Sequence, residues 1–356
     1  MKQPFVRFGG ALLLATALAA CSGTSQAVPT GPAQLQPSHM QTPQSAVHPD
    51  GKYHGVVSVT SADRAMARTM SITGKPHILP MRLKNPFAKV RPDSTVGYPL
   101  DMSCQTKKCP VMNASVAYNL YVTPDGKACA TEKCWGNPEE FLKALTGSPL
   151  AAVSTQYTGG DASKYTFGGS VAVQYHLNYS NTFYNNDLFT VLAAGYKKFH
   201  ATGLNAQYHI FLPPGIDTCF DQYGECYSPD NLNSFFFCAY HTAAIAGPGV
   251  YLVYSVEPYQ NAKVTVNGQK FYGCQNQVVP KGTNRLNSGT ASTLSHESEE
   301  AWSDPLPNSG WFNPAYGMED ADVCAYAFMA TEHMGGKSWY VQKNYSNTYH
   351  GCADVP

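Results

Sequence analysis

Strand-like and helix-like segments alternate along this chain from about residue 98, and this alternation constrains the fold more than any other feature. Residues 137–147 open with Asn-Pro and close on Gly147, and residues 185–203 open with Asn and close on Gly203, which is typical of helices. Segments rich in β-branched and aromatic residues predict strands at 114–122, 151–157, 170–177, 207–213, 234–241 and 249–256. We therefore expect one α/β domain with a central, mostly buried sheet flanked by helices.

The first 97 residues have a different character. A basic start, a short apolar run and the sequence Leu-Ala-Ala-Cys predict a lipoprotein signal peptide at residues 1–20, cleaved before Cys21 and lipidated on that thiol; an ordinary signal with a chance cysteine is the alternative. Residues 21–51, rich in Pro, Ser and Gln, predict a disordered tether. Residues 52–97 are basic and are expected to be an extension of the globular domain at 98–356. The protein is thus expected to be lipid-anchored to the cell envelope, at the outer membrane where one exists, or secreted, with the lipid as its membrane contact.

The composition excludes two function classes. The chain has 24 basic and 24 acidic residues, a formal net charge of zero, and no basic stripe that would bind nucleic acid. It also has no G-x-S-x-G segment, which a serine hydrolase of the α/β type would need.

Ten of the eleven cysteines remain once Cys21 is set aside, and an even number in an exported chain predicts disulfides. Two pairs are local, Cys104 with Cys109 and Cys129 with Cys134. No histidine lies near either pair, so loop staples are favoured over halves of a zinc knuckle. The sequence leaves the connectivity of the other six open, and the pairing we expect is Cys219–Cys226, Cys238–Cys274 and Cys324–Cys352.

One charge-rich segment, Ser-His-Glu-Ser-Glu-Glu-Ala-Trp-Ser-Asp-Pro at 295–305, contains the pattern H-E-x-x-E. Residues 288–303 predict a helix that ends before the proline. Positions four apart share a helix face, so His296 and Glu300 point together and Glu297 lies beside them, as in the zinc-binding H-E-x-x-H helix. Glu299 is expected to point away and to be solvated. A polar helix face that carries acidic residues by chance is the alternative interpretation.

A metal ion would give this pattern a hydrolytic role. Catalytic zinc takes three protein ligands and holds a water, whose pKa it lowers toward about 7, and a neighbouring carboxylate accepts the proton. We expect His296 and Glu300 to be ligands and Glu297 to be the general base. A further ligand is expected from Glu319 or Asp322, three positions apart in a later acidic segment. Because carboxylates outnumber histidines, manganese, iron or calcium are alternatives to zinc.

Three more residues are candidates for supporting roles. Asp304 follows the helix at its C-terminal end, where the dipole disfavours an anion, although a plain Asp-Pro turn would also explain it. His241 follows an apolar strand and is either a ligand, an oxyanion donor or, more commonly in proteins, a core histidine. Tyr326 is a candidate oxyanion donor but is one of 23 tyrosines.

The order of these motifs resembles a family of secreted bacterial proteins and is also similar to plant exordium, or phosphate-induced, proteins. The resemblance covers about residues 111–352 and rests on S-H-E-x-x-E-A-x-x-D-P at 295–305, E-x-x-D-x-C at 319–324, the Phe-Cys-Ala-Tyr-His segment at 237–241 and Ser-Trp-Tyr-Val-Gln at 338–342. It implies a zinc-peptidase-like, or metallopeptidase-like, domain, and the family pattern maps onto His296, Glu297, Glu300, Asp304, Glu319, Asp322 and Cys324.

Two functions are expected from these motifs. The first is a zinc-dependent metallohydrolase, foremost a peptidase, acting on a peptide or cell-wall substrate. The second is a non-catalytic, metal-stabilised surface module of the exordium type that binds a wall polymer or a partner. An enzyme needs Glu297 as a base, whereas a purely structural metal site needs only the ligands.

Overall fold

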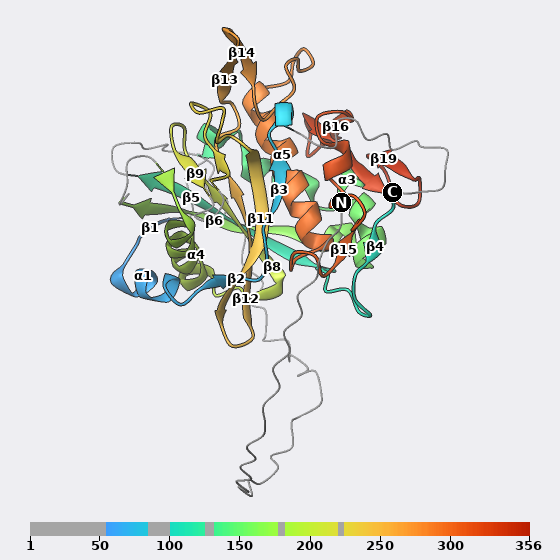
Figure 1. Cartoon of the computed structure of the whole chain (residues 1–356). Helices are drawn as coiled ribbons and strands as arrows, with labels where there is room; N and C mark the ends of the chain where they lie inside the picture. Colours follow the sequence, from blue (N-terminus) through green and yellow to red (C-terminus); the bar gives the residue numbers. More distant parts are fainter. Residues whose placement is uncertain (1–54, 85–99, 125–131, 177–181, 220–223) are drawn as a thin grey trace, which may run out of the picture. The chain divides into compact units, whose positions relative to one another are not determined.

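A mixed sheet of eight strands forms the centre of the protein in this computed structural model (Figure 1). The structure describes residues 55–84, 100–124, 132–176, 182–219 and 224–356, all within one compact unit. The first five strands are parallel to one another, and the last three pair in antiparallel fashion. In spatial order they are β1 (Val56–Ser58), β6 (Tyr165–Tyr175), β5 (Ser115–Pro124), β8 (Gly203–Phe211), β12 (Val250–Glu257) and β11 (Phe237–Gly247), with β2 (Ser71–Ile72) and β3 (His77–Pro80) both paired to β11.

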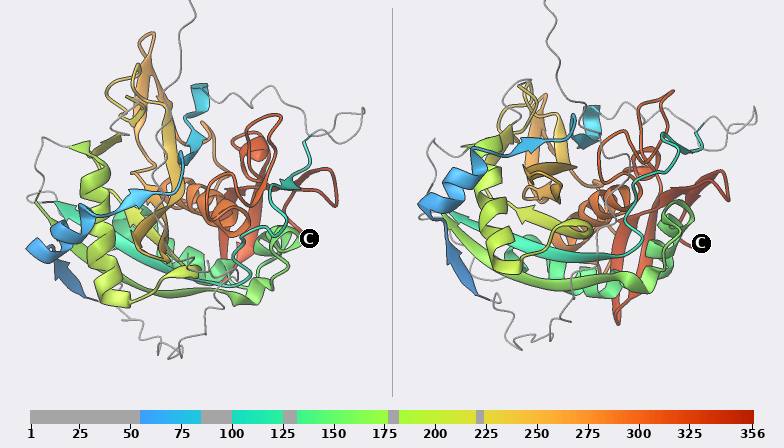
Figure 2. Two further views of the ribbon diagram at one scale, coloured as in Figure 1. Left: turned by 60° about the horizontal axis from the view of Figure 1, so that its bottom comes forward. Right: turned by 90° about the horizontal axis from the view of Figure 1, so that it is seen from below.

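Helices cover both faces of the sheet, as an α/β domain requires. On β5, Leu120 and Val122 join one hydrophobic core and Tyr121 joins the other, because successive side chains point to opposite faces. Figure 2 shows α4 and α5 well separated beside the twisted sheet in two further views. The first core lies under α1 (Ser61–Ala67) and α4 (Asn185–Phe199), and the second lies under α2 (Pro138–Leu145) and α5 (Arg285–Ser303), against which α3 (Pro149–Thr158) packs.

Short elements extend from this framework. In the described part of the chain they include the 3₁₀ helices η1 (Arg82–Lys84), η3 (Glu132–Trp135), η4 (Ala162–Lys164) and η5 (Asp322–Cys324). The small sheets pair β7 (Thr182–Phe183) with β9 (Asp217–Cys219) and β10 (Cys226–Tyr227), β4 (Ser103–Cys104) with β15 (Trp311–Phe312), β13 (Lys263–Val266) with β14 (Gln269–Tyr272), β16 (Met329–Met334) with β17 (Lys337–Gln342), and β18 (Asn344–Ser346) with β19 (Gly351–Ala353).

Most elements predicted from the sequence are confirmed. The strands at 114–122, 170–177, 207–213, 234–241 and 249–256 correspond to β5, β6, β8, β11 and β12, and the three helices to α2, α4 and α5. The strand predicted at 151–157 is wrong, because these residues lie in α3. Ser148 caps that helix by accepting a hydrogen bond from the Ala151 N–H at 3.1 Å, Pro149 is its first residue and Gly159 ends it.

The domain boundary expected at residue 98 is too late, because strands from the expected extension complete the central sheet. β1 lies parallel to β6, and β2 and β3 pair with β11. Without them β11 would be an edge strand with unpaired backbone groups. The signal peptide, the lipidation of Cys21 and the tether fall outside the described residues and stay predictions. Within the described ranges, no helix is both long enough and apolar enough to cross a membrane.

Four disulfides staple the described part of the chain, and all four are pairs predicted from the sequence. Cys134 forms no disulfide with another described cysteine. Its expected partner Cys129 lies outside the described residues, so that bridge stays a prediction. The observed pairs are Cys104–Cys109, Cys219–Cys226, Cys238–Cys274 and Cys324–Cys352.

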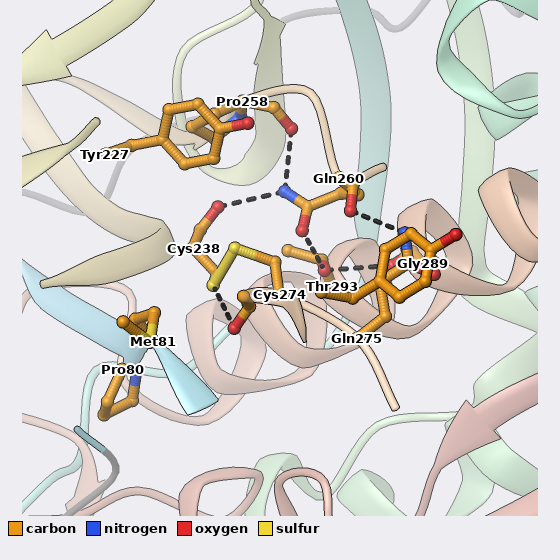
Figure 3. Close-up of a disulfide and its surroundings, with 12 residues drawn as sticks. Pro80, Met81, Tyr227, Cys238, Pro258, Gln260, Cys274, Gln275, Gly289 and Thr293 are labelled. Atoms are coloured by element: carbon orange, nitrogen blue, oxygen red, sulfur yellow. Dashed lines mark hydrogen bonds between the residues drawn. A yellow bond between two sulfur atoms is a disulfide. The ribbon is translucent and has the colours of Figure 1, made fainter. Parts of the chain in front are cut away.

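The bridge between Cys238 and Cys274 ties β11 to the segment that leads into α5 (Figure 3). Beside it, the Gln260 side-chain amide donates to the Cys238 carbonyl at 2.9 Å and accepts from the Thr293 hydroxyl of α5 at 3.0 Å. The Gln275 amide in turn donates to the Gln260 carbonyl at 2.6 Å. One disulfide and a short amide chain therefore hold α5 against the sheet.

Candidate metal centre

Helix α5 carries ionisable side chains into the protein interior. It begins after Asn284, whose side-chain oxygen accepts from a backbone N–H three positions on at 3.0 Å. His296 and Glu297 have no exposed surface, and Glu300 is 1% exposed. An ionised carboxylate without a partner is costly in such a place, by several kcal/mol even after relaxation, so these groups require compensating partners.

His296, Glu300 and Asp322 form a cluster at the middle of α5, as the sequence predicts. His296 Nε2 lies 3.1 Å from Glu300 Oε1 and 3.8 Å from Asp322 Oδ1. One ligand atom from each residue lies within 4.8 Å of the other two. Asp322 opens η5, which the Cys324–Cys352 bridge fastens to β19. The segment between the end of α5 and η5 therefore turns back toward α5, as a ligand set that contains both His296 and Asp322 requires.

Glu319 reaches a second cluster, which contains His241 and Glu300. Its backbone N–H donates to Asp322 Oδ2 at 3.0 Å, which fixes the acidic segment. Its carboxylate is fully buried, with Oε1 3.6 Å from His241 Nε2. One ligand atom each from His241, Glu300 and Glu319 lies within 4.8 Å of the others. The four predicted ligands thus divide over two adjoining clusters that share Glu300.

His241 connects the candidate base to these clusters. Its Nδ1 lies 3.3 Å from Glu297 Oε2 and 3.6 Å from Glu300 Oε2, while its Nε2 lies 3.4 Å from the Asp304 carbonyl oxygen. It stands on β11 and has no exposed surface. The structure therefore places His241 beside the candidate base Glu297 and the candidate ligand Glu300. From the sequence, a core histidine away from the site was the more common expectation.

His77 is a cluster residue that was not predicted from the sequence. Strand β3 sets it opposite His241 in antiparallel register, with ring centroids 5.8 Å apart and planes 17° from parallel. His77 Nδ1 lies 2.9 Å from Glu319 Oε2. A short apolar segment, Pro-His-Ile-Leu-Pro, was the available signal for a strand. This segment pairs with β11, which lies far along the chain, so no spacing between neighbouring residues could predict the pairing.

Asp304 organises the loop after α5. Its Oδ1 accepts from the N–H groups of Ser309 at 3.0 Å and Gly310 at 2.7 Å, and its Oδ2 accepts from Asn308 at 2.6 Å. Asp304 also has a ligand atom within 4.8 Å of His77 and Glu319. Because three backbone donors already use its oxygens, a positioning role suits Asp304 better than metal ligation.

Tyr326 holds β3 in place and is not a free oxyanion donor. Its hydroxyl donates to the Pro80 carbonyl at 3.0 Å. That proton is therefore committed to the end of the strand that carries His77. The oxyanion role considered for Tyr326 would require this hydrogen bond to break, and it stays a prediction.

The expectation that Glu299 is solvated is also wrong. Glu299 has no exposed surface, and its Oε2 accepts hydrogen bonds from Ser154 of α3, at 2.8 Å, and from Asn344 of β18. It points from α5 toward α3, the segment predicted from the sequence to be a strand. Glu299 therefore belongs to the packing between helices rather than to the metal ligands.

Burial shifts the pKa values of the whole cluster toward uncharged forms. Desolvation raises the pKa values of Glu297, Glu300, Glu319 and Asp322 well above the usual range, and the negative charge of neighbouring carboxylates raises them further. It also lowers the pKa of His296, lowers that of His241 strongly, and brings that of His77 to about 4. The histidines are therefore neutral, the form in which imidazole binds metals.

Two further observations show that the cluster side chains suit a metal ion: among the described residues, their carboxylates have no lysine or arginine partner, and several of their buried atoms have no hydrogen-bond partner. No described lysine or arginine forms an ion pair with any of these four carboxylates, whose ion-pair partners are all histidines. Several inward atoms also lack any hydrogen-bond partner although they are buried, and buried polar groups rarely remain so. These atoms are His296 Nε2, Glu297 Oε1, Glu300 Oε1, Glu319 Oε1 and Oε2, and Asp322 Oδ1.

A pocket of about 420 Å³ leads from the surface to this cluster. His77 and Asp322 line it, so it touches both ligand sets from outside. Lys75 and Lys84 stand along its walls with Phe236. The pocket could admit part of a substrate to a centre that is otherwise buried.

Comparisons with protein families, with characterised proteins and with solved structures find no match to this chain.

Proposed function

We propose that this protein is a zinc-dependent metallohydrolase whose substrates are peptides. The observation that carries the proposal is the set of unpartnered, buried ligand atoms on His296, Glu300 and Asp322, next to Glu297 and reached by a pocket. One imidazole and two carboxylates suit a divalent ion, and the neutral histidine needs no deprotonation to bind it. The resemblance of the motif order to that of zinc-peptidase-like proteins supports peptides as the substrate class.

Glu297 is the candidate general base. When bound, zinc would supply Lewis acidity and lower the pKa of a coordinated water to about 7. Glu297 stands one residue from His296 on the helix and 3.3 Å from His241 Nδ1, so an imidazole N–H there would orient its carboxylate. Its buried setting raises its pKa, so it holds a proton well once it has taken one, and it can then pass the proton to the leaving amine.

We further propose that the enzyme acts at the cell envelope, held there by a lipid on Cys21. The signal-like start and the four disulfides support export, because disulfides persist in oxidising compartments. The substrate is accordingly a peptide or a peptide-bearing wall polymer outside the cytoplasm.

The test joins metal analysis to peptide cleavage. Glu297→Gln keeps the shape of the side chain and removes the base, so bound zinc should remain while turnover of a mixed peptide library falls about 10²–10⁴-fold. His296→Ala should lose both zinc and cleavage, because it removes a primary ligand. Glu299→Gln is the matched control, since this glutamate is equally buried on the same helix but faces Ser154, and it should keep both.

Two outcomes would redirect the proposal. Cleavage by Glu297→Gln at the wild-type rate would remove the base from the mechanism. If the wild-type chain binds zinc and cleaves no peptide, a metal-stabilised binding module of the exordium type becomes the better account.

A further inference from the structure

Glu300 faces two different histidines with its two carboxylate oxygens. Oε1 lies 3.1 Å from His296 Nε2, and Oε2 lies 3.6 Å from His241 Nδ1. A carboxylate that binds a single ion beside one histidine does not need its second oxygen to face another histidine. A carboxylate that bridges two ions uses both, as in two-metal sites, where the ions lie about 3.5–4 Å apart.

Glu319 repeats this division on the side of the pocket. Its Oε1 lies 3.6 Å from His241 Nε2, and its Oε2 lies 2.9 Å from His77 Nδ1. Both oxygens are buried and lack a hydrogen-bond partner. Glu319 belongs to the ligand sets of His241 and of His77, and not to the set of His296, Glu300 and Asp322.

Charge balance leaves room for a second ion. The four carboxylates of Glu297, Glu300, Glu319 and Asp322 carry a formal charge of −4 when ionised, and all are buried. With one divalent ion, two of these carboxylates must hold protons, because no described lysine or arginine pairs with them. Two divalent ions would bring the formal charge to zero with all four ionised, and uncompensated buried charge is strongly unfavourable.

We propose that the centre binds two divalent ions. The first lies with His296, Asp322 and one oxygen of Glu300. The second lies with His241, Glu319 and the other oxygen of Glu300, whose ligand atoms lie within 4.8 Å of one another. His77, 2.9 Å from Glu319 Oε2, positions that carboxylate from the pocket wall. This inference rests on the proposed function for the first ion and adds a second, next to the pocket where a substrate would meet it. Strand β3, which joins the sheet from the N-terminal segment, is then part of the centre.

Metal stoichiometry of the full chain tests the proposal. After chelator treatment, titration with Zn²⁺ and removal of free ion, the wild type should hold two ions per chain by elemental analysis. His241→Ala should hold one, and His77→Ala, which frees the Glu319 carboxylate, should bind the second ion more weakly. His333→Ala is the matched control, because this histidine is exposed on β16, and it should hold two. Loading with Mn²⁺ should give the exchange-coupled electron paramagnetic resonance spectrum of an ion pair in the wild type and an uncoupled spectrum in His241→Ala.

The outcomes separate this inference from the proposed function. One ion per wild-type chain, lost with His296→Ala while Glu297→Gln still abolishes cleavage, would overturn the ion pair and leave the peptidase standing. Two ions retained in His241→Ala would also overturn it. An uncoupled Mn²⁺ spectrum from a wild type that holds two ions would place the second ion elsewhere and overturn the shared Glu300.

Discussion

The three glutamates on one stretch of α5 are chemically identical, and their neighbours give them different roles. Glu299 faces hydroxyl and amide donors on Ser154 and Asn344, which satisfy one of its oxygens. All three leave Oε1 without a hydrogen-bond partner, but Glu297 and Glu300 face neutral histidines and other carboxylates instead of hydroxyl and amide donors. A buried carboxylate that faces imidazoles and further carboxylates is a candidate for a cation or a proton.

Gln342 controls which nitrogen of His296 carries the proton. Its amide nitrogen lies 3.0 Å from His296 Nδ1 and donates to the Ala321 carbonyl at 3.0 Å. With the amide in this orientation Nδ1 would accept, and the ring proton would lie on Nε2, which faces the carboxylates of Glu300 and Asp322. A metal on Nε2 requires the proton on Nδ1, and the amide must then turn its oxygen toward the ring. Gln342→Leu removes that acceptor. We expect zinc affinity to fall about 10–100-fold in a competition titration with a chromophoric chelator.

Gln342→Glu provides the comparison. Its carboxylate accepts from Nδ1–H without any rotation, so this variant should bind zinc at least as tightly as the wild type. Both variants should keep the wild-type circular dichroism spectrum. An unchanged affinity in Gln342→Leu would show that the amide does not orient the ring.

At the scale of elements, the features that depend on local rules are predictable from the sequence. Helix α5 and the spacing of His296 and Glu300 come from caps and from the helical repeat, and the acidic segment at 319–322 comes after a Pro- and Gly-rich turn region. The position of β3 depends on pairing with a strand far along the chain, so His77 could not be placed.

Helix α3 was missed for another reason. Its buried residues include Leu150 and Val153, and an apolar run of this length fits a buried strand equally well. The Ser-Pro start would have decided between them.

The bridge between Cys324 and Cys352 ties the acidic segment to β19. It closes 28 residues, and replacing both cysteines with serine should lower the free energy of unfolding by about 3–4 kcal/mol on the chain-entropy estimate. Because Asp322 lies two residues from Cys324 in η5, zinc affinity should fall as well. Urea denaturation and a zinc titration under non-reducing conditions measure the two effects.

The bridge between Cys219 and Cys226 is the control for this prediction. It closes seven residues between β9 and β10, which carry none of the candidate ligands. Its removal should cost about 2 kcal/mol and leave zinc affinity unchanged. Equal losses of zinc affinity from both double variants would mean that general destabilisation, rather than the position of Asp322, weakens the site.

At the scale of the whole molecule, a row of hydrogen-bonded polar side chains connects two neighbouring strands of the central sheet. The Ser255 hydroxyl of β12 donates to Glu257 Oε1 at 2.8 Å and lies 2.8 Å from His209 Nδ1 on the neighbouring β8. All three residues are buried, and Glu257 Oε2 lacks a hydrogen-bond partner. The charge of Glu257 would also raise the pKa of Glu297. A buried acid in the sheet core therefore makes the stability of the fold depend on pH.

Burial raises the pKa of Glu257 from its ordinary value of 4.5 to about 8. Between these values the folded protein holds a proton that the unfolded chain has released. The free energy of unfolding therefore falls as pH rises through this window, by up to about 1.4 kcal/mol per pH unit from this group. Below pH 4.5 both states are protonated and the group contributes no pH dependence.

Glu257→Gln removes this dependence, because the amide imitates the protonated acid and does not ionise. Relative to the wild type, the variant should become progressively more stable from pH 4.5 to about pH 8, and the difference should then level off. Urea denaturation at intervals of one pH unit measures it. Glu140→Gln is the control, since this glutamate is 41% exposed, pairs with Lys337 at the surface and should show no comparable slope. A stability difference between wild type and Glu257→Gln that stays constant across the window would mean that Glu257 ionises as readily in the folded sheet as in the unfolded chain.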